Sequence, residues 1–410
     1  MSKNRKLVPK LIFPKFRNTA GWSEQFGNVL FDQISDKKPH PGLPVLAITQ
    51  EHGAIPRNLI DYHVSVTEKS IESYKVVQPG DFIISLRSFQ GGIEYSQYQG
   101  ICSPAYVVLR RRGKGSDAYF RQYLKTEKFI QILTKNLEGL RDGKMISYKQ
   151  FSQLQIPVPV FEEQQKIADC LSSLDELIAA QTRKVDALKT HKKWLMQQLF
   201  PREGKTQPRL RFPEFRDADA WSKRKLSDFL TERSQFPEIK VPLYSLTIED
   251  GVTPKTERYE RAFLVNNEAE AYKLVLPNDF AFNPMNLRFG AIGRHSGTEA
   301  VAVSKYYNIF YCDDSVDSRF CAIYFRIDEM VRFYDTMAIG SLIEKRRVHF
   351  SDFLKFNIRF PSLLEQHRIA DCLTSLDILI TAATQELETL KTHKKGLMQQ
   401  LFPSAEAVEV

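Results

Sequence analysis

Apolar residues recur at alternating steps of three and four along two stretches of the chain, residues 163–201 and 365–403. This spacing places them on one side of an α-helix, and its persistence over about five heptads favours a coiled-coil seam. In the first stretch the seam is formed by Ile167, Leu171, Leu174, Ile178, Val185, Leu188, Lys192, Leu195 and Leu199. In the second stretch it is formed by Ile369, Leu373, Leu376, Ile380, Leu387, Leu390, Lys394, Leu397 and Leu401.

The two helical stretches are copies of each other, with 27 of 39 aligned residues identical. The segment PKLIFPKFRNTAGW near the start of the chain also returns as PRLRFPEFRDADAW before the second copy. A repeat with a period of about 200 residues means that a whole domain with its following helix has been duplicated. Two unrelated core helices are the alternative, and the matching polar interruptions of the two rows argue against it.

The residues between these landmarks predict small mixed domains. Segments such as VVQPGDFIISL and SPAYVVLRRR are rich in β-branched residues and bounded by turn residues, which is typical of short strands. Segments such as AYFRQYLKTEKFIQILTKN and FCAIYFRIDEMVRFYDTMA indicate helices, so the fold class is α+β. The predicted order is domain 1–160, helix 161–201, linker 202–208, domain 209–360, helix 361–403 and tail 404–410.

The short linker predicts how the helices pair. The termini of a domain usually lie close together, so the second helix should run back along the first as an antiparallel coiled coil with an approximate two-fold axis. With residues 183 and 385 at that axis, Lys192 lies opposite Leu376 and Lys394 opposite Leu174. Each lysine is then expected to direct its ammonium group at a neighbouring carboxylate, Asp377 and Asp175 respectively.

Charge and composition favour a polyanion as partner. The net charge is +9, and residues 1–160 hold 23 Lys and Arg against 13 Asp and Glu, whereas residues 203–360 hold 24 against 23. Five cysteines without a CxxC pair suit a reducing cytoplasm and argue against a structural zinc site. No apolar run has the roughly 18 residues needed to span a membrane, and no metal-binding motif or complete catalytic motif is present.

Candidate DNA-binding residues lie in loops and in basic runs. Arg, Asn and Gln can pair with base edges, and basic runs suit phosphate. The candidates in the first domain are Arg87, Ser88, Gln90, Arg110, Arg111, Arg112 and Lys114. The candidates in the second domain are Asn283, Asn286, Arg288, Arg294, His295, Lys345, Arg346 and Arg347.

The repeated motifs EQxxIADxLxxLD and KKxLMQQLF, each after a variable domain, resemble the specificity subunit of Type I restriction–modification systems. The resemblance implies two target recognition domains joined by constant helices, in a subunit that is not itself catalytic. It also implies double-stranded DNA, two methyltransferase subunits that bind S-adenosylmethionine, and two restriction subunits that use ATP and Mg²⁺. The expected location is the cytoplasm of a bacterium or archaeon, and the expected role is defence against phage.

Two other functions fit parts of the sequence. A coiled-coil scaffold with duplicated protein- or RNA-binding domains would show the same repeat. A self-sufficient methyltransferase would require an S-adenosylmethionine motif, and the one suggestive tetrad, Asn283-Pro284-Met285-Asn286, lacks the expected last two residues. The resemblance favours a DNA-binding subunit whose bipartite, asymmetric target has a spacer set by helix length.

Overall fold

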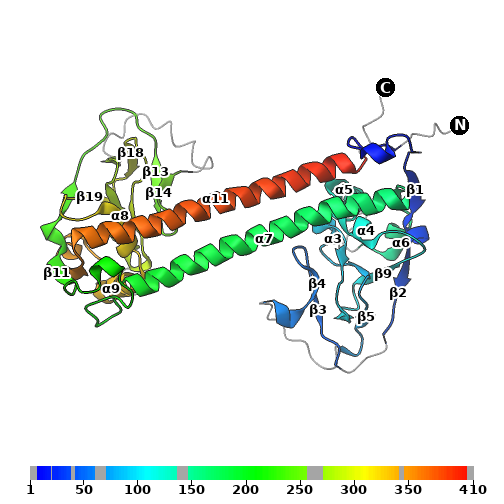
Figure 1. Cartoon of the computed structure of the whole chain (residues 1–410), viewed down its shortest axis with the longest axis horizontal. Helices are drawn as coiled ribbons and strands as arrows, with labels where there is room; N and C mark the ends of the chain where they lie inside the picture. The colour runs from blue at the N-terminus through cyan, green and yellow to red at the C-terminus, as the bar shows by residue number, and fades with distance from the viewer. Residues whose placement is uncertain are drawn as a thin grey trace. The chain divides into compact units, whose positions relative to one another are not determined.

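The computed structural model describes residues 7–19, 21–37, 42–60, 71–135, 146–255, 271–340 and 346–403. The chain divides into two units, Met1–Arg183 with Gln385–Val410, and Lys184–Thr384. The division falls inside the two long helices, drawn in green and in orange to red in Figure 1. Each unit therefore holds one mixed domain together with one part of each helix.

The two predicted long helices are confirmed. Helix α7 spans Phe161–Leu199 and helix α11 spans Leu363–Leu401, 39 residues each. Every predicted seam residue is buried or partly buried, whereas most other positions of both helices are exposed. The polar interruption Gln181 is also buried and donates a hydrogen bond of 2.8 Å to Glu386.

Both predicted lysine contacts are present, one in each unit. In the first unit Lys394 Nζ lies 2.6 Å from Asp175 Oδ1, and in the second Lys192 Nζ lies 2.5 Å from Asp377 Oδ1. The Gln181–Glu386 bond runs in the same sense, since a higher residue number on α7 meets a lower one on α11. Within each unit the two helix segments are therefore antiparallel, in the predicted register.

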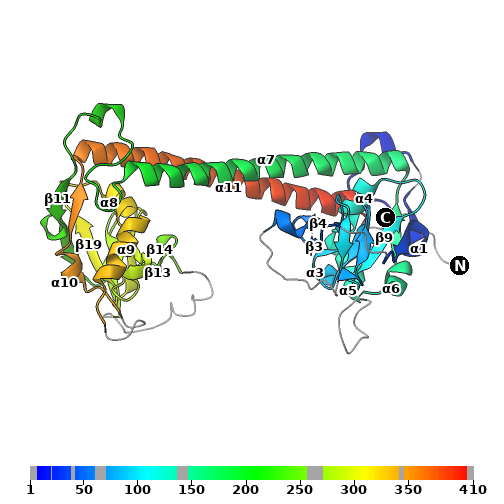
Figure 2. The ribbon, with the colours of Figure 1, turned by 90° about the horizontal axis from the view of Figure 1, so that it is seen from below.

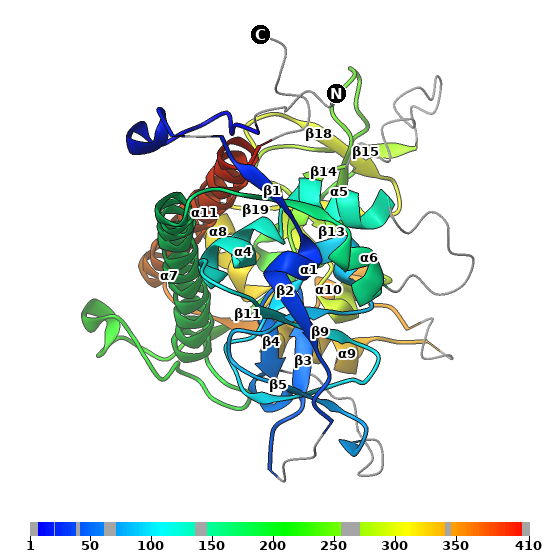
Figure 3. The same cartoon turned by 90° about the vertical axis from the view of Figure 1, so that its right-hand side faces the viewer.

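The first unit is built on a four-stranded antiparallel sheet in the order β2-β9-β6-β7. Its strands are β2 (Phe31–Ile34), β9 (Val107–Arg111), β6 (Phe82–Ile84) and β7 (Glu94–Tyr95). Three antiparallel pairs accompany it, namely β1 (Ser23–Phe26) with β10 (Gln155–Val158), β3 (Leu46–Thr49) with β4 (Gly53–Pro56), and β5 (Lys75–Val77) with β8 (Gly100–Cys102). Its short helices are α1 (Gly27–Leu30), α3 (Ser88–Gly91), α4 (Asp117–Tyr123), α5 (Glu127–Lys135) and α6 (Tyr148–Ser152), and its 3₁₀ turns are η1 (Pro14–Phe16) and η2 (Arg57–Leu59). Figure 3 shows α1 and α6 beside β1 and β2.

The second unit repeats this topology with a sheet in the order β12-β19-β16-β17. Its strands are β12 (Leu230–Arg233), β19 (Asn308–Cys312), β16 (Phe280–Phe282) and β17 (Ile292–Arg294). The pairs are β11 (Ser222–Lys225) with β20 (Asn357–Phe360), β13 (Tyr244–Thr247) with β14 (Gly251–Pro254), and β15 (Tyr272–Val275) with β18 (Val301–Ser304). Its helices are α8 (Ser318–Tyr324), α9 (Asp328–Met337) and α10 (Phe350–Phe353), and its 3₁₀ turns are η3 (Pro213–Phe215), η4 (Leu226–Asp228) and η6 (Leu287–Phe289).

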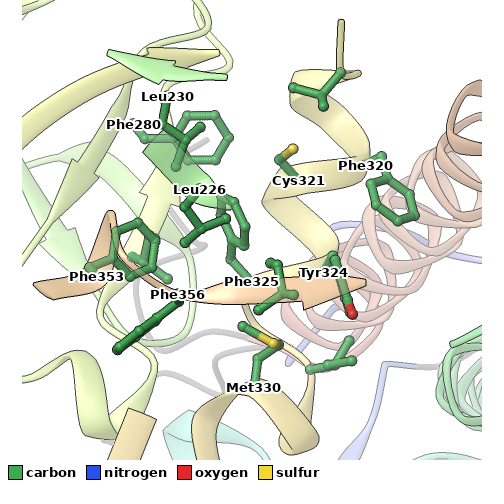
Figure 4. Close-up of a cluster of buried hydrophobic side chains, with 14 of the residues drawn as sticks. Leu226, Leu230, Phe280, Phe320, Cys321, Tyr324, Phe325, Met330, Phe353 and Phe356 are labelled. Atoms are coloured by element: carbon green, nitrogen blue, oxygen red, sulfur yellow. The ribbon is translucent and has the colours of Figure 1, made fainter. Parts of the chain in front are cut away.

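An aromatic core fixes the long helices to each domain. In the second unit Phe320, Tyr324 and Phe353 belong to one buried cluster that also contains Leu199 of α7 and Leu373 of α11 (Figure 4). In the first unit the start of α7 and the end of α11 join the core of the domain in the same way. The seam and the domain cores are therefore continuous, and burial of these apolar side chains supplies most of the attachment energy.

A glutamine at the start of each long helix makes the attachment directional. Gln164 Oε1 accepts a hydrogen bond from the Ser116 backbone N–H (3.0 Å), and its Nε2 donates to Pro159 O (2.9 Å). Gln366 makes the same two bonds, with the Asp317 N–H (3.0 Å) and with a proline carbonyl (3.0 Å). All four backbone groups are close to helix ends or strand ends, where they would otherwise lack partners. The repeated EQ dipeptide is thus explained by satisfaction of buried polar groups.

Candidate nucleic-acid interface

The loop that follows β6 in the first unit is held rigidly by its own backbone and by two glycines. Ser88 Oγ accepts a hydrogen bond of 2.9 Å from the Ser85 N–H, and Ser88 is only 1% exposed. Gly92 has φ +84°, and a Cβ there would lie 2.2 Å from Leu124 O, so only glycine fits. These constraints leave Arg87 and Gln90 exposed at the tip. The prediction that Ser88 belongs to the binding surface is wrong, because its side chain closes the turn.

The turn between β3 and β4 lies against this loop, as Figures 1 and 2 show for β3, β4 and α3. A Cβ on Gly91 would lie 2.5 Å from the Gln50 side chain, so the two segments are in close contact. Lys125 fixes the turn, since its Nζ donates to Gln50 O at 3.0 Å and pairs with Glu94 at 2.5 Å. Gln50 is not marked as a candidate by the sequence, because no local pattern shows that this turn meets the loop after β6.

A polar cavity of about 520 Å³ opens beside the same turn. Gln50, His52, Gln97, Tyr98, Arg121 and Lys125 are among the residues that line it. Amide and guanidinium groups of this kind can donate to and accept from base edges, and Tyr98 can stack on a base. Together with Arg87 and Gln90 they form the candidate interface of the first unit.

The corresponding loop of the second unit, residues 283–290, exposes different groups. Asn283 Oδ1 accepts the Met285 N–H at 3.0 Å, which makes Asn283 a turn residue. Arg288 is turned inward, with a side chain only 13% exposed, and pairs with Asp335 at 2.9 Å. Met285, Asn286 and Phe289 are the exposed residues of this loop. The predicted role of Arg288 in base contact is therefore wrong, because its guanidinium group is already bound inside the unit.

Two further candidates of the second unit serve the fold. His295 is 2% exposed, and its Nε2 lies 2.7 Å from Glu299 O. Arg294 is half-buried and donates to Asn278 Oδ1, and burial lowers the pKa of its guanidinium group. Both residues follow the strand β16 in the chain and were grouped with its loop, yet the structure places their polar groups against the protein itself. They are removed from the candidate surface.

The three consecutive arginines of the first unit do not form one phosphate-binding patch. Successive residues of a strand point to opposite faces, so β9 separates Arg110 from Arg111. Arg110 makes two bonds to the buried Asp81, of 2.7 and 2.9 Å, and Arg111 pairs with Asp117. Arg112 lies 3.3 Å from Asp32 on the surface. Arg110 and Arg112, with side chains 45% and 54% exposed, remain candidates for phosphate contact, whereas Arg111 is 19% exposed and bound to Asp117.

The remaining basic candidates are divided. Lys114 is exposed in the turn after β9, and Arg347 is exposed before α10. Arg346 donates to the carbonyl oxygens of Asp335 (2.6 Å) and Ala338 (3.1 Å), so it has a structural role. Lys345 lies outside the described residues. The basic candidates that remain exposed for phosphate contact are thus Arg110, Arg112, Lys114 and Arg347.

In the described part of the chain, no group of three or more His, Cys, Asp or Glu side chains could hold a metal ion. No helix among the same residues is long and apolar enough to cross a membrane. The free thiols of Cys102 and Cys321 are buried, and burial raises the pKa of each.

The comparisons with known proteins agree with this geometry. Residues 25–190 match the family model "Type I restriction modification DNA specificity domain". Two relatives from Methanocaldococcus jannaschii are each 24% identical, the "Type I restriction enzyme MjaVIII specificity subunit" and the "Putative type I restriction enzyme MjaX specificity subunit". The first alignment covers 83% of this chain and 81% of the relative, and the second covers 88% and 86%.

One solved structure shares the fold over its whole length. The "Crystal structure of Type-I restriction-modification system S subunit from M. genitalium" aligns with a TM-score of 0.55 at 15% identity, over 97% of this chain and 100% of that chain. Residues 25–190 therefore match a type I restriction–modification DNA specificity domain, and most of the chain is similar to type I specificity subunits, which supports recognition of DNA sequence as its function.

Proposed function

We propose that this chain recognises a bipartite, asymmetric DNA target, with one half-site for each unit. The observation that carries the proposal is the contrast between a shared framework and unlike loops. Both units use the same strand order and the same glutamine anchor. At equivalent loop positions, however, one unit exposes Arg87 and Gln90 and the other exposes Met285, Asn286 and Phe289. Base-edge contacts determine sequence preference, so unlike loops favour unlike half-sites.

The proposed arrangement is two target recognition domains, residues 1–160 and 209–360, joined by α7 and α11 as one antiparallel coiled coil with an approximate two-fold axis. The lysine–aspartate pairs support it, because they occur at equivalent positions in the two units. A helix of 39 residues is about 58 Å long, which corresponds to roughly 17 base pairs of duplex. In this arrangement the length of the helices sets the number of unread base pairs between the half-sites.

The remaining activities belong to partner subunits in this proposal. Two methyltransferase subunits bind S-adenosylmethionine and methylate adenine in each half-site, and two restriction subunits use ATP and Mg²⁺. This chain holds no catalytic residue and positions the other subunits on the target. A scaffold for proteins or RNA is less well supported, because the family match is to a DNA specificity domain.

Mapping of methylated adenines tests the proposal directly. The chain is expressed with its methyltransferase subunits in a host that lacks adenine methylation, and the genome is sequenced by a method that detects the modified base. The expected result is one motif with two different halves and a fixed spacer. The matched control expresses the methyltransferase subunits alone and should give no motif. A motif that is present without this chain, or a symmetric motif, would contradict the proposal.

A further inference from the structure

A second cavity of the first unit, of about 780 Å³, is strongly basic. It lies between α5 and the last turns of α11. Seven lysines line it, namely Lys10, Lys125, Lys128, Lys135, Lys391, Lys394 and Lys395. Among the described lining residues, Glu127 is the only one with a carboxylate. Its floor is apolar, with Tyr123, Ile132, Met398 and Phe402.

Part of this positive charge is balanced by carboxylates of the same unit, in pairs that are partly buried for Lys125 and Lys394 and exposed for Lys395. Lys125 pairs with Glu94, Lys394 with Asp175 at 2.6 Å, and Lys395 with Glu127 at 2.7 Å. Lys128 donates to Pro403 O at 2.7 Å, and burial lowers the pKa of its ammonium group. The lysines therefore hold the walls of the cavity together, and they do not all carry available charge.

Three exposed lysines at the rim carry the positive charge that these pairs do not balance. They are Lys10, Lys135 and Lys391. Lys391 pairs only with Glu388 on its own helix in the described region, at 2.8 Å, and such an exposed pair contributes little. Like charges gathered around a cavity repel one another, and an anion placed among them relieves that repulsion.

Two of these lysines, Lys128 and Lys135, have no basic counterpart in the second unit. Helix α9 repeats α5, with Met330 and Tyr334 buried where α5 buries Phe129 and Leu133. In that alignment Glu329 stands in the place of Lys128, and Thr336 in the place of Lys135. The same packing is thus achieved with an acidic and a neutral residue, so the fold does not require Lys128 or Lys135, whereas Lys10 and Lys391 have basic counterparts in Arg209 and Lys189.

The cavity adjoins the candidate interface through a single short helix. Thr134 of α5 donates to Phe89 O of the loop after β6, at 3.3 Å, while Gln131 and Lys135 of α5 line the cavity. Nine residues of helix are about 14 Å long. This is similar to the roughly 12 Å width of the major groove, so phosphates that border a groove contacted by the loop lie within reach of the rim.

We propose that this cavity is a phosphate-binding site for the duplex DNA backbone that flanks the first half-site. The inference rests on the proposed function, and it adds a sequence-independent contact to the first unit. The lysine rim contributes affinity for the phosphodiester backbone, whereas the loop after β6 contributes sequence preference. An acidic protein segment in the same cavity is the competing occupant, which the experiment distinguishes.

The test uses the complete complex of this chain with its methyltransferase subunits and a duplex of scrambled sequence. The variant combines Lys10→Gln, Lys135→Gln and Lys391→Gln, none of which contributes to the buried core. Fluorescence anisotropy measures the affinity at several salt concentrations. The slope of log affinity against log salt should become shallower by roughly two to three units, since each lost phosphate contact removes about 0.9.

The matched control combines Lys15→Gln, Lys149→Gln and Lys166→Gln, which are exposed lysines of the same unit away from the cavity. It makes the same change of charge and should leave the slope within half a unit of wild type. Equal slopes for the two variants would overturn the proposal, as would loss of methyltransferase subunits from the cavity variant with the slope unchanged. Scrambled DNA keeps this test separate from the proposed function, which fails instead if the wild-type complex shows no preferred sequence.

Discussion

The loops after β6 and β16 occupy the same place in two units of the same topology, yet they present different chemistry. One exposes a guanidinium group and an amide, Arg87 and Gln90. The other exposes Asn286 between two apolar side chains, Met285 and Phe289. The positions adjacent to these exposed groups are fixed by turn hydrogen bonds and glycines in both units. The framework therefore constrains where the loop lies, and it leaves the identity of its exposed side chains free to vary.

The buried ion pairs of the framework differ between the two units, although the topology is the same. A buried aspartate stands at the start of β6 and of β16, and each is paired with arginine. Asp81 pairs with Arg110 of β9, whereas Asp279 pairs with Arg233 of β12, and the distance is 2.7 Å in each pair. The equivalent positions hold Tyr311 in place of Arg110, and Ile34 in place of Arg233. What the fold requires is a cation beside the buried carboxylate, and it can come from the adjacent strand of the sheet, as in the first unit, or from the strand beyond that one, as in the second.

A second pair of equivalent acids differs more sharply. Glu365 is 1% exposed and makes two bonds to Arg211, of 2.9 and 2.6 Å. Glu163 is 3% exposed, but Ile12 stands where Arg211 would be, and the Trp22 indole donates to it instead. In the second unit the Trp221 indole nitrogen has no hydrogen-bond partner among the described residues. The same position thus carries an ion pair in one unit and a desolvated acid in the other.

The largest expected effect comes from shortening both helices, which tests whether the two units act as readers at a fixed separation. Deletion of residues 178–184 together with 380–386 removes one heptad from each helix, about 10 Å. The two half-sites should stay unchanged, and the spacer should shrink by roughly three base pairs. Methylation mapping measures the outcome. A deletion of 178–184 alone is the control and should abolish the paired register. A folded, active double deletion that keeps the original spacer would contradict the proposed ruler.

Breaking the buried ion pair of the second unit should cost stability. Glu365→Gln leaves the Arg211 side chain, 6% exposed, without its counter-ion, and such a loss costs about 3–5 kcal/mol. Urea unfolding of the full chain, followed by tryptophan fluorescence, measures the change. Glu214→Gln is the matched control, because its pair with Arg368 is exposed on both sides and should cost less than about 1 kcal/mol. Equal losses of stability for the two substitutions would show that the buried Arg211–Glu365 pair contributes no more than the exposed pair.

The exchange of arginine between strands predicts a rescue. Arg110→Tyr should destabilise the first unit by about 3 kcal/mol, because Asp81 is 1% exposed and loses its cation. Adding Ile34→Arg reproduces the arrangement of the second unit and should recover most of the loss. Thermal unfolding of the single and double variants measures the coupling. Ile34→Arg alone is the control, and additive effects of the two substitutions would disprove the exchange.

The two loops should act on separate half-sites. Gln90→Ala should relax base preference only in the half-site of the first unit, and Asn286→Ala only in that of the second. Loss of a good bidentate pair reduces discrimination by about 1–3 kcal/mol. Competition binding on duplexes with single base changes measures it for the complex with methyltransferase subunits. Arg288→Ala should instead lower stability, since Arg288 is held by Asp335. If either loop variant reduced base discrimination in both half-sites, the two loops would not act on separate half-sites.

The smallest expected effect concerns Glu163, the buried acid that is bonded to Trp22 in place of an arginine. Burial raises the pKa of Glu163 above 4.5, so folding is opposed by its ionisation as the pH rises through that window. Glu163→Gln should therefore stabilise the protein slightly above about pH 5, by less than about 1 kcal/mol, and change nothing below pH 4. Melting temperatures across this pH range measure the difference. A destabilisation at neutral pH comparable to that of Glu365→Gln would show that the two acids are equivalent after all.

The sequence by itself determined the elements whose information is local or repeated. The spacing of apolar residues located both long helices, and the lysines at 192 and 394 fixed their antiparallel register, which both ion pairs confirm. The duplication revealed two units and their α+β class. The breaks at 124–126 and 325–327, which divide each of two predicted helical stretches into two short helices, contain no proline or glycine that would mark them in the sequence.

Which polar residues are available for binding depends on contacts that form in the folded chain. Arg110, Arg288 and His295 look like surface groups in the sequence, and each is bound by a partner far along the chain or turned inward by its loop. Conversely, Gln50 joins the candidate interface because a hairpin turn packs against a glycine about 40 residues away. Sequence shows which groups can bind DNA, whereas long-range packing and ion pairing determine which of them remain free to do so.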